Sequence, residues 1–279
     1  MDNITNGLSI VATPIGNLDD ITYRAVKVLE ECNIIICENP KHSLKLLNKL
    51  GIKKKLIALH DYNEHKIINQ IKVLLKNKNC VLISDAGSPL ISDPGYNLVQ
   101  YCIANNIRVT SVPGPSSIVC GLQLSGLPIS EFVFFGFVPK SRKKIADLVK
   151  NISEEKRTCV FFVSNHKLII FLDCLENIMG NRSISICKEL TKINEFVFRG
   201  SPGSVKNRIL KDKENIKGEF VAVIDRQTLK NQDFDKIDLY SKELRKMATK
   251  FSLTDIVEIV HKFTRINKNK IYKWLLKLK

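Results

Sequence analysis

The 279-residue sequence predicts two α/β domains followed by a short helical extension. Short runs of β-branched residues alternate with helical patterns through the first 125 residues, which is typical of a mostly parallel sheet covered on both faces. Strand patterns then dominate from Glu131 to Asp225, and the last segment is basic and amphipathic. We therefore predict an N-terminal α/β domain at 1–125, a second α/β domain with a mixed sheet at 126–226, and a basic helical extension at 239–279.

In the first domain, a helical pattern follows each predicted strand. Asp20 is expected to cap the first helix, and Gly51 to end the second. The segment Asn63–Lys78 has Ile and Leu at helical spacing, with lysines on its other face. The predicted strands are Leu8–Thr13, Asn33–Cys37, Lys55–Leu59, Cys80–Ser84 and Ile107–Val112.

The second domain is expected to begin after a join at Ser125–Ser130. Its predicted strands are the runs EFVFFGFV, RTCVFFV, SISICKEL, NEFVFRG and GEFVAVI, and its predicted helices are Lys140–Lys150, His166–Met179 and Ser201–Lys211. A polar stretch, Arg226–Asp238, leads into the extension. Two short amphipathic helices fit in its last segment, Ser252–Lys279, capped by Thr254 and Asn267.

The formal net charge of +16 points to a polyanionic partner. Between Arg226 and Lys279, 14 Lys or Arg stand against 6 Asp or Glu, so half of the excess lies in the last fifth of the chain. Compositional drift would spread it more evenly, which favours a nucleic-acid surface. The alternative for the extension is a solvated helical tail.

Cysteine and hydropathy patterns exclude other classes. The eight cysteines lie mostly in apolar segments without a C-x-x-C pair, so buried reduced thiols are expected, and the five histidines do not supply paired zinc ligands. We predict no metal site. The sequence has no run long enough to span a membrane and begins without a secretory signal, so we expect a cytoplasmic protein without a membrane partner.

Three Gly- and Pro-containing loops follow strands of the first domain: Thr13–Thr22, Ser84–Gly95 and Val112–Ser117. Parallel strands would bring them to one edge of the sheet, where such folds bind ligands. The loops lack the G-x-x-x-x-G-K-[ST] and G-x-G-x-x-G patterns of nucleotide sites, and their strand-end residues include no Lys or Arg. This favours a ligand without phosphates, and S-adenosylmethionine fits. The alternative is that the loops only turn the chain.

The motifs TPIGNLDDIT, SDAGSPLISDPG, PGPSS, SGLP, KELTKINEFVFRG and KGEFVAVI resemble the tetrapyrrole-methylase superfamily, and within it the bacterial methyltransferases of ribosomal RNA ribose. The resemblance runs from Leu8 to the C-terminal helices. It implies a cofactor cleft between the two domains, S-adenosylmethionine as cofactor, and a homodimer. It also implies a substrate: the ribose 2′-hydroxyl of a decoding-centre cytidine in 16S rRNA of the small ribosomal subunit.

On these motifs we place the cofactor-binding residues in the three loops and on one strand of the second domain. Asp85 is expected near the cofactor, with capping of the helix that follows as its alternative, while Gly87 and Gly114 allow close backbone approach. The alternative for Phe162 is a core position in its strand. Asp93 is read instead as a helix cap, before Pro94 in the first helical turn. The full set is Pro14, Gly16, Asp85, Ala86, Gly87, Pro89, Gly114, Pro115, Ser116 and Phe162.

Methyl transfer to a hydroxyl benefits from a general base. The candidates are Glu38, which the family motif also supplies, and Glu189; for each the alternative is a salt bridge or a helix cap. His60 and His166 are weaker candidates. The RNA-binding residues are expected to form a phosphate-gripping rim: Lys41, His42, Arg142, Lys143, Lys144, Lys188 and Lys192.

Three motifs depart from the family pattern. Asn39 stands where an acid is usual, Val163 replaces a Glu, and Lys188 replaces an Arg, which keeps the charge but loses the bidentate fork. Two other functions therefore stay open. One is methylation of a tetrapyrrole ring carbon, although the first loop lacks the G-x-G-x-G-D pattern of that branch. The other is a non-catalytic RNA-binding protein of ribosome assembly.

Overall fold

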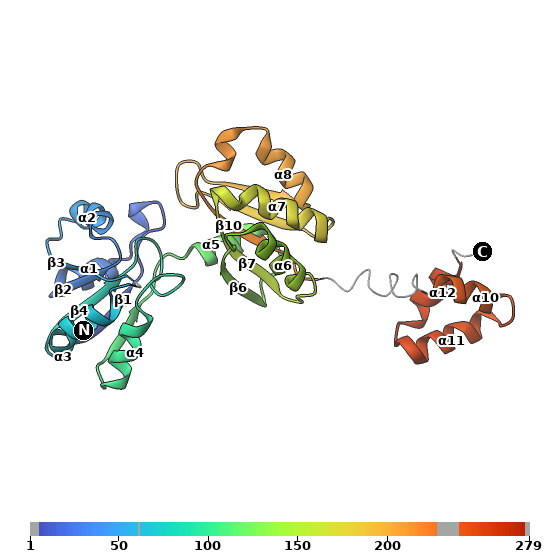
Figure 1. Ribbon diagram of the computed structural model, residues 1–279, viewed down its shortest axis with the longest axis horizontal. Helices are drawn as coiled ribbons and strands as arrows, with labels where there is room; N and C mark the ends of the chain where they lie inside the picture. The colour runs from blue at the N-terminus through green and yellow to red at the C-terminus, as the bar shows by residue number, and fades with distance from the viewer. Residues whose placement is uncertain (1–5, 61, 228–239, 277–279) are drawn as a thin grey trace. The chain divides into compact units, whose positions relative to one another are not determined.

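The structure is a computed structural model that describes residues 6–60, 62–227 and 240–276. The chain divides into two compact units, Met1–Arg226 and Gln227–Lys279. The first contains two sheets with their helices, and the second is helical (Figure 1). The predicted fold class, two α/β halves with C-terminal helices, is confirmed.

The first sheet is parallel throughout and has the strand order β3-β2-β4-β1-β5. Its five strands lie close to the predicted positions, so the alternation of strand and helix patterns was a sufficient guide to them. They are β1 (Gly7–Val11), β2 (Ile34–Cys37), β3 (Lys55–Ala58), β4 (Asn79–Ile83) and β5 (Val109–Val112).

Helices cover both faces of this sheet, because successive strand residues point to opposite sides. In β2, Ile35 packs with α1 and α2, whereas Ile36 packs with α3 and α4. The helices are α1 (Tyr23–Glu31), α2 (Pro40–Lys49), α3 (Glu64–Asn77) and α4 (Tyr96–Ala104).

Two predicted helix ends have different outcomes. Gly51 follows α2 with φ +72°, a conformation in which glycine has no steric penalty, so that prediction is confirmed. Asp20 does not cap α1. It lies in a short 3-10 turn, Leu18–Asp20, and Thr22 is the N-cap, with its hydroxyl accepting from the amide of Ala25 at 3.1 Å.

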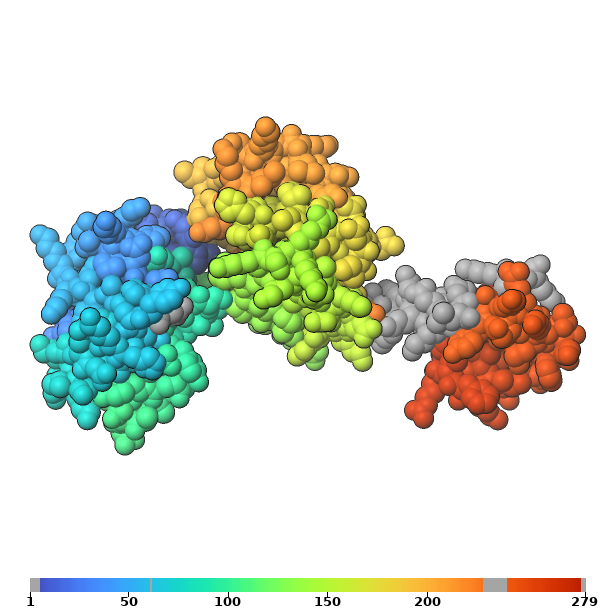
Figure 2. All heavy atoms as spheres, viewed as in Figure 1, coloured from blue at the N-terminus to red at the C-terminus, as the bar shows by residue number. Residues whose placement is uncertain are grey.

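The second sheet is mixed, as predicted, with strand order β6-β7-β10-β8-β9. Only β6 and β7 pair in parallel among its described strands; the other neighbours are antiparallel. The strands are β6 (Phe132–Phe137), β7 (Thr158–Ser164), β8 (Ile184–Lys188), β9 (Phe196–Gly200) and β10 (Glu219–Ile224). In the space-filling view, the blue-to-green and yellow-to-orange parts of the first unit, Met1–Arg226, lie against each other (Figure 2).

One face of the second sheet is covered by α6 (Arg142–Ile152), α7 (Asn165–Met179) and α8 (Pro202–Leu210). The other face packs against α5 (Ser117–Ser125), which follows β5 of the first sheet. Gly121 permits this close approach, since a Cβ there would lie 2.8 Å from Cγ1 of Val221. The predicted boundary at residue 125 thus follows a helix whose buried side chains pack on the second sheet.

The second unit has three described helices: the two that were predicted within Ser252–Lys279, and one before that segment that was not predicted. They are α10 (Ser241–Ala248), α11 (Leu253–Thr264) and α12 (Lys268–Leu276), packed around Ile256, Ile271 and Trp274. Asn267 accepts from the amide of Asn269 at 2.9 Å, as its predicted capping role requires. Thr254 is not the cap of α11, because Ser252 takes that position. Residues 228–239, most of the predicted polar stretch, lie outside the described residues.

The cysteine thiols and the hydropathy of the helices complete the description of the fold. The eight cysteines are free, with Cys120 half-buried and the others buried. Burial raises the pKa of several of their thiols, that of Cys187 to about 12. Within residues 6–60, 62–227 and 240–276, no helix has the length and apolar character needed to cross a membrane.

Candidate functional site

The loops after β1 and β4 are joined at the carboxyl edge of the first sheet. Thr13 and Gly87 form an isolated bridge, in which the Thr13 amide donates to the Gly87 carbonyl at 2.9 Å and the Gly87 amide returns a bond of 3.0 Å. The buried Thr13 hydroxyl donates to the carbonyl of Ser84 at 3.2 Å. The expectation that these loops share one edge is confirmed, because β5 also runs parallel to β1.

A cavity of about 530 Å³ lies between this edge and the second sheet. The first sheet contributes the loops after β1, β4 and β5, and the second contributes the ends of β6 and β7, the start of β10 and Leu190. Among the described residues, its polar lining contains three carboxylates and no Lys or Arg. The residues of the lining include Ile15, Asp85, Asp93, Phe162, Asn165 and Glu219.

Five of the ten predicted cofactor-binding residues line this cavity: Asp85, Ala86, Gly87, Ser116 and Phe162. The other five, Pro14, Gly16, Pro89, Gly114 and Pro115, lie in the same loops but not in the lining. Their assignment to the cofactor stays a prediction.

Gly16, in the loop after β1, packs closely against the turn after β8. A Cβ at this position would lie 2.8 Å from the carbonyl oxygen of Leu190 and 2.8 Å from Oγ1 of Thr191. The amide of Asn17 donates to that Thr191 hydroxyl at 3.0 Å. The first loop therefore rests directly on the turn after β8, which brings Ile15 and Leu190 into the same lining.

Asp85 presents a partly unsatisfied carboxylate to the cavity. Its Oδ2 lies 3.4 Å from Nδ1 of His42, while its buried Oδ1 has no hydrogen-bond partner among the described residues. Buried carboxylate oxygens are normally hydrogen-bonded, so this atom is available to a donor on a ligand. His42, predicted to bind RNA, faces Asp85 and has a half-exposed side chain; its RNA-binding role stays a prediction.

Asp93 is not the helix cap that the sequence suggested. The N-cap of α4 is Gly95, and no side chain caps it in that position. Instead, the buried Glu64 of α3 accepts from the amide of Leu98 at 3.0 Å and from Nδ2 of Asn97 at 2.9 Å. Asp93 is thereby left to line the cavity.

The pKa of Asp93 is raised to about 6, chiefly by burial. A hydrogen bond from Ser84 opposes the shift, and the negative charges of Glu38 and Asp85 add to it. A carboxylate whose charged form is disfavoured in this way binds a proton more readily. Glu38 itself follows β2 and does not belong to the cavity lining.

Glu189, directly after β8, connects the turn after β8 to the start of β10. Its Oε1 accepts from the amide of Glu219 at 2.8 Å and from Nζ of Lys192 at 3.0 Å. Burial works against its charge, but these hydrogen bonds and the charges of Lys192 and Lys188 lower its pKa. The assignment of Glu189 as a general base stays a prediction, and this geometry disfavours it because the carboxylate is engaged and outside the lining.

The predicted basic rim divides into exposed and engaged cations. Arg142, Lys143 and Lys144 are exposed on the first turn of α6, and Lys41 is exposed at the start of α2. Lys188 must be corrected: it is 8% exposed, and its Nζ donates to the carbonyl of Glu214, so it cannot grip a phosphate at the surface.

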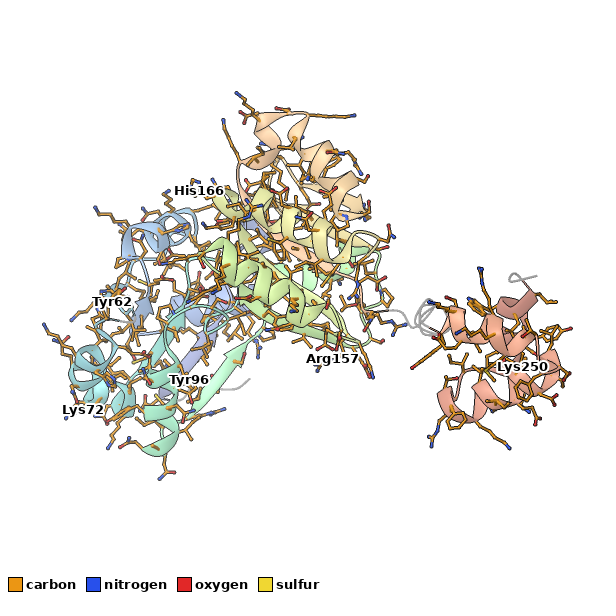
Figure 3. The ribbon with its side chains drawn as sticks, turned by 45° about the vertical axis from the view of Figure 1, so that its right-hand side comes forward. Tyr62, Lys72, Tyr96, Arg157, His166 and Lys250 are labelled. Carbon is orange, nitrogen blue, oxygen red and sulfur yellow. The ribbon has the colours of Figure 1, made fainter. Side chains whose placement is uncertain are left out.

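Lys192 is likewise engaged, since its Nζ lies 3.0 Å from Glu189 and 2.9 Å from Glu219. His166, a weaker candidate base, lies exposed on the first turn of α7 (Figure 3) and is not in the lining. Neither residue presents a free group to the cavity.

Two departures from the family pattern have local explanations. Asn39 caps α2, with its Oδ1 accepting from the amides of Lys41 at 3.1 Å and His42 at 3.4 Å. Val163 is 2% exposed in β7, where an apolar side chain packs in the core. Val163 also belongs to the cavity lining, so this departure from Glu falls within the site itself.

Several lining residues were missed from the sequence. Asp93 stood in a recognised motif, but its capping interpretation was wrong. Asn165, Gly218 and Glu219 were assigned no site role, because only the docking of the second sheet brings the end of β7 and the start of β10 to the loops of the first. Within the described residues, no group of three or more His, Cys, Asp or Glu could hold a metal ion.

Comparisons with known proteins agree with this architecture. Residues 7–206 match the family model described as Tetrapyrrole (Corrin/Porphyrin) Methylases. The chain is 36% identical over 277 residues to "Ribosomal RNA small subunit methyltransferase I" of Pasteurella multocida, covering 98% of each protein. The crystal structure of a uroporphyrin-III-C-methyltransferase from Thermus thermophilus has the same fold, with a TM-score of 0.56 at 16% identity over 79% of this chain and 94% of that one.

A protein of the same name from Thermotoga maritima is 42% identical over 218 residues. The alignment covers 97% of that relative but only 78% of this chain. A relative of this name therefore exists without a counterpart to about a fifth of the present sequence.

Proposed function

The chain belongs to the tetrapyrrole (corrin/porphyrin) methylase family, and from that premise we propose that it methylates ribosomal RNA of the small subunit with S-adenosylmethionine. The acceptor in this proposal is the ribose 2′-hydroxyl of a decoding-centre cytidine in 16S rRNA. The names printed for its relatives support the RNA substrate. Such a substrate would place the reaction in the cytoplasm.

The observation that carries the cofactor assignment is the charge of the cavity. The lining holds Asp85, Asp93 and Glu219 but no Lys or Arg, which suits a ligand bearing a sulfonium and an ammonium group and disfavours one bearing phosphates. Its volume of about 530 Å³ lies in the range of small-molecule sites. When bound, S-adenosylmethionine supplies an electrophilic methyl group.

The residues of the chain would act by binding and positioning. The unpartnered Oδ1 of Asp85 would accept from a polar group of the cofactor. Ile15, Phe162 and Leu190 supply apolar surface for its adenosine, and Gly87, with φ +78°, lets the backbone approach closely. Displacement at the methyl carbon requires the attacking oxygen in line, so this positioning contributes much of the acceleration.

The first experiment uses small ribosomal subunits from cells that lack this methylation. Labelled methyl from S-adenosylmethionine should enter these particles in preference to free tetrapyrroles. The product should resist alkali at one phosphodiester, because a methylated 2′-oxygen cannot attack its neighbouring phosphate. Label on a base or on a tetrapyrrole would overturn the proposed acceptor.

The exposed cations of α6 are proposed to hold RNA phosphates. Positive charges in the first turn of a helix oppose its dipole, so Arg142, Lys143 and Lys144 do not serve the stability of α6. Changing all three to Glu should weaken particle binding about tenfold or more and reduce its salt dependence, since fewer counterions are released. Cofactor affinity should not change.

A matched control has the same charge change elsewhere. Lys72, Lys76 and Lys78 are exposed near the end of α3 (Lys72 is labelled in Figure 3). Their replacement by Glu should affect particle binding far less. An equal loss in both triple variants would show that overall charge, and not the start of α6, determines affinity.

The helical unit is proposed to bind RNA without taking part in methyl transfer. Its described residues carry exposed cations such as Arg245, Lys250 and Lys273 beside exposed Phe263 and Tyr272. Cations and aromatic faces together suit single-stranded RNA. Deleting 227–279 should lower particle affinity and leave cofactor binding intact. Unchanged particle affinity would show that the basic charge of this unit reflects amino-acid composition and not RNA binding.

The homodimer is a further proposal, which rests on the family resemblance. Light scattering of the purified protein should give twice the monomer mass of 31.7 kDa. A monomer with full methyl-transfer activity would exclude it.

A further inference from the structure

The three carboxylates that line the cavity have different surroundings. Asp85 faces the imidazole of His42 at 3.4 Å. Glu219 has a largely exposed side chain, and its Oε2 accepts from Nζ of Lys192 at 2.9 Å. Asp93, by contrast, is in no ion pair within the described residues. Of the three, it is the carboxylate that has no basic side chain paired with it among the described residues.

The fold does not need Asp93 as a helix cap. The buried carboxylate of Glu64 reaches across from α3 and accepts from the amide of Leu98, the third residue of α4. It also accepts from the side-chain amide of Asn97 at 2.9 Å. The carboxylate of Glu64, on another helix, thus accepts from the first turn of α4 as a local N-cap Asp normally would. Asp93 lies in the cavity lining instead.

The backbone around Asp93 is held in an unusual conformation. Leu90 and Ser92 have φ of +74° and +69°, and Gly95 has φ of +122°. Left-handed conformations at non-glycine residues are costly and persist where the surrounding structure imposes them, commonly at functional sites. Leu90 packs with the buried core of the first sheet, which fixes the loop from inside. The position of Asp93 is therefore imposed by the fold.

The electrostatic surroundings favour protonation of this carboxyl group. Burial has the largest effect, and the negative charges of Glu38 at the end of β2 and Asp85 at the end of β4 act in the same direction. The Ser84 hydroxyl acts against them, and His42 of α2 faces the site through Asp85. These are the groups that face Asp93 from the elements around it.

We propose that Asp93 is the general base that takes the proton of the acceptor hydroxyl. This inference rests on the proposed function. As the oxygen of the acceptor forms its bond to the methyl carbon, the bond between that carbon and the sulfonium sulfur breaks, and the electron pair stays on sulfur. The proton of the hydroxyl passes to the carboxylate of Asp93, which releases it to water after the product leaves.

A base of this kind works best when its pKa lies near the working pH, and that of Asp93 is about 6. Glu189, the candidate from sequence, lies outside the lining, and its lowered pKa makes it a weaker proton acceptor. Glu38 also lies outside the lining but contributes to the field at Asp93. Asp93 would thus accept the proton, whereas Glu38, outside the lining, would only raise the proton affinity of Asp93.

The test measures single-turnover methyl transfer to small ribosomal subunits with the full-length chain. The isosteric change Asp93→Asn should lower the rate by about 10²–10⁴-fold, the usual contribution of a general base. S-adenosylmethionine affinity, measured by calorimetry, should stay unchanged. The wild-type rate should rise with pH through a pKa near 6 and then level off, and this acid limb should be absent in the residual activity of the variant.

Asp173→Asn is the matched control. This carboxylate is partly buried on α7 and pairs with Lys206, which Glu176 also holds. The Asp173→Asn substitution should leave both the rate of methyl transfer and its pH profile unchanged. Asp93→Glu should recover part of the rate, since it restores a carboxylate on a longer side chain.

Each other outcome overturns the proposal. A normal rate in Asp93→Asn excludes the residue as base, and a parallel loss of cofactor affinity makes it a cofactor-binding group. If thermal melting shows that Asp93→Asn does not fold, the wild-type pH profile decides, and the absence of an acid limb rejects the base. Failure of the wild-type protein to methylate the particles would instead reject the proposed function.

Discussion

The loop after β4 and the turn after β8 carry the same kind of residue but use it differently. Both follow strands, and both belong to motifs from which site residues were predicted. In the loop, Asp85 has an unpartnered buried oxygen and Asp93 has a raised pKa. In the turn, Glu189 binds Lys192 and the amide of Glu219, and its pKa is lowered.

Backbone conformation does not separate the two regions. Leu90 and Ser92 in the loop have positive φ, and so do Glu189 and Thr191 in the turn. What separates them is the supply of donors: the turn brings a lysine and a backbone amide to its carboxylate, whereas the loop brings further carboxylates together. A motif acid is therefore chemically available where the tertiary structure supplies it with few compensating donors and cations.

The largest expected effect tests the loop. Asp85→Ala should weaken S-adenosylmethionine binding by about 10- to 100-fold, the effect of losing a hydrogen bond to a charged group. Thermal stability should not fall. Among the described residues, the side chain of Asp85 faces only His42, which is half-exposed and can bind water instead. Calorimetry and thermal melting measure the two quantities. Unchanged affinity with a lower melting temperature would make Asp85 a structural residue like Glu189.

The next test concerns the turn. Glu189→Ala should lower the free energy of unfolding by about 2 kcal/mol, since it leaves the amide of Glu219 without its acceptor and removes one of the two carboxylates that pair with Lys192. Denaturant titration measures this loss. Glu189→Gln, which retains an acceptor oxygen, should lose less. A stable Glu189→Ala protein with a base-deficient pH profile would reverse the comparison and restore the prediction from sequence.

The smallest effect contrasts the two carboxylates through pH. A pKa that is raised on folding disfavours the ionised native state, so Asp93→Asn should be more stable than wild type by about 1 kcal/mol at neutral pH, after allowance for solvent screening. This gain should vanish as pH falls from about 6 to the ordinary value of 3.8. For Glu189→Gln the sign is opposite: its loss of stability should be present above the ordinary pKa of Glu and disappear as pH falls. Unfolding curves at several pH values would contradict this contrast if both variants changed in the same direction.

Much of the fold was predictable because it depends on local periodicity. The strands of both sheets and helices such as α3 and α7 lie close to where the spacing of apolar residues placed them. Helix ends were less predictable: the caps of α1 and α11 are Thr22 and Ser252, each a few residues from the acid or hydroxyl that was chosen. Several polar residues near such an end can serve as caps, and the sequence does not rank them.

The sequence by itself determined the two α/β halves, the edge at which the three loops meet, and the absence of basic residues from those loops. These follow from side-chain periodicity and from the parallel arrangement of the first sheet. Only the tertiary structure decided which acid is available. Glu64 reaches α4 from α3, and the amide of Glu219 at the start of β10 reaches the carboxylate of Glu189. The proton affinity of a carboxylate depends on charges and donors within a few ångströms, and residues distant in sequence supply them.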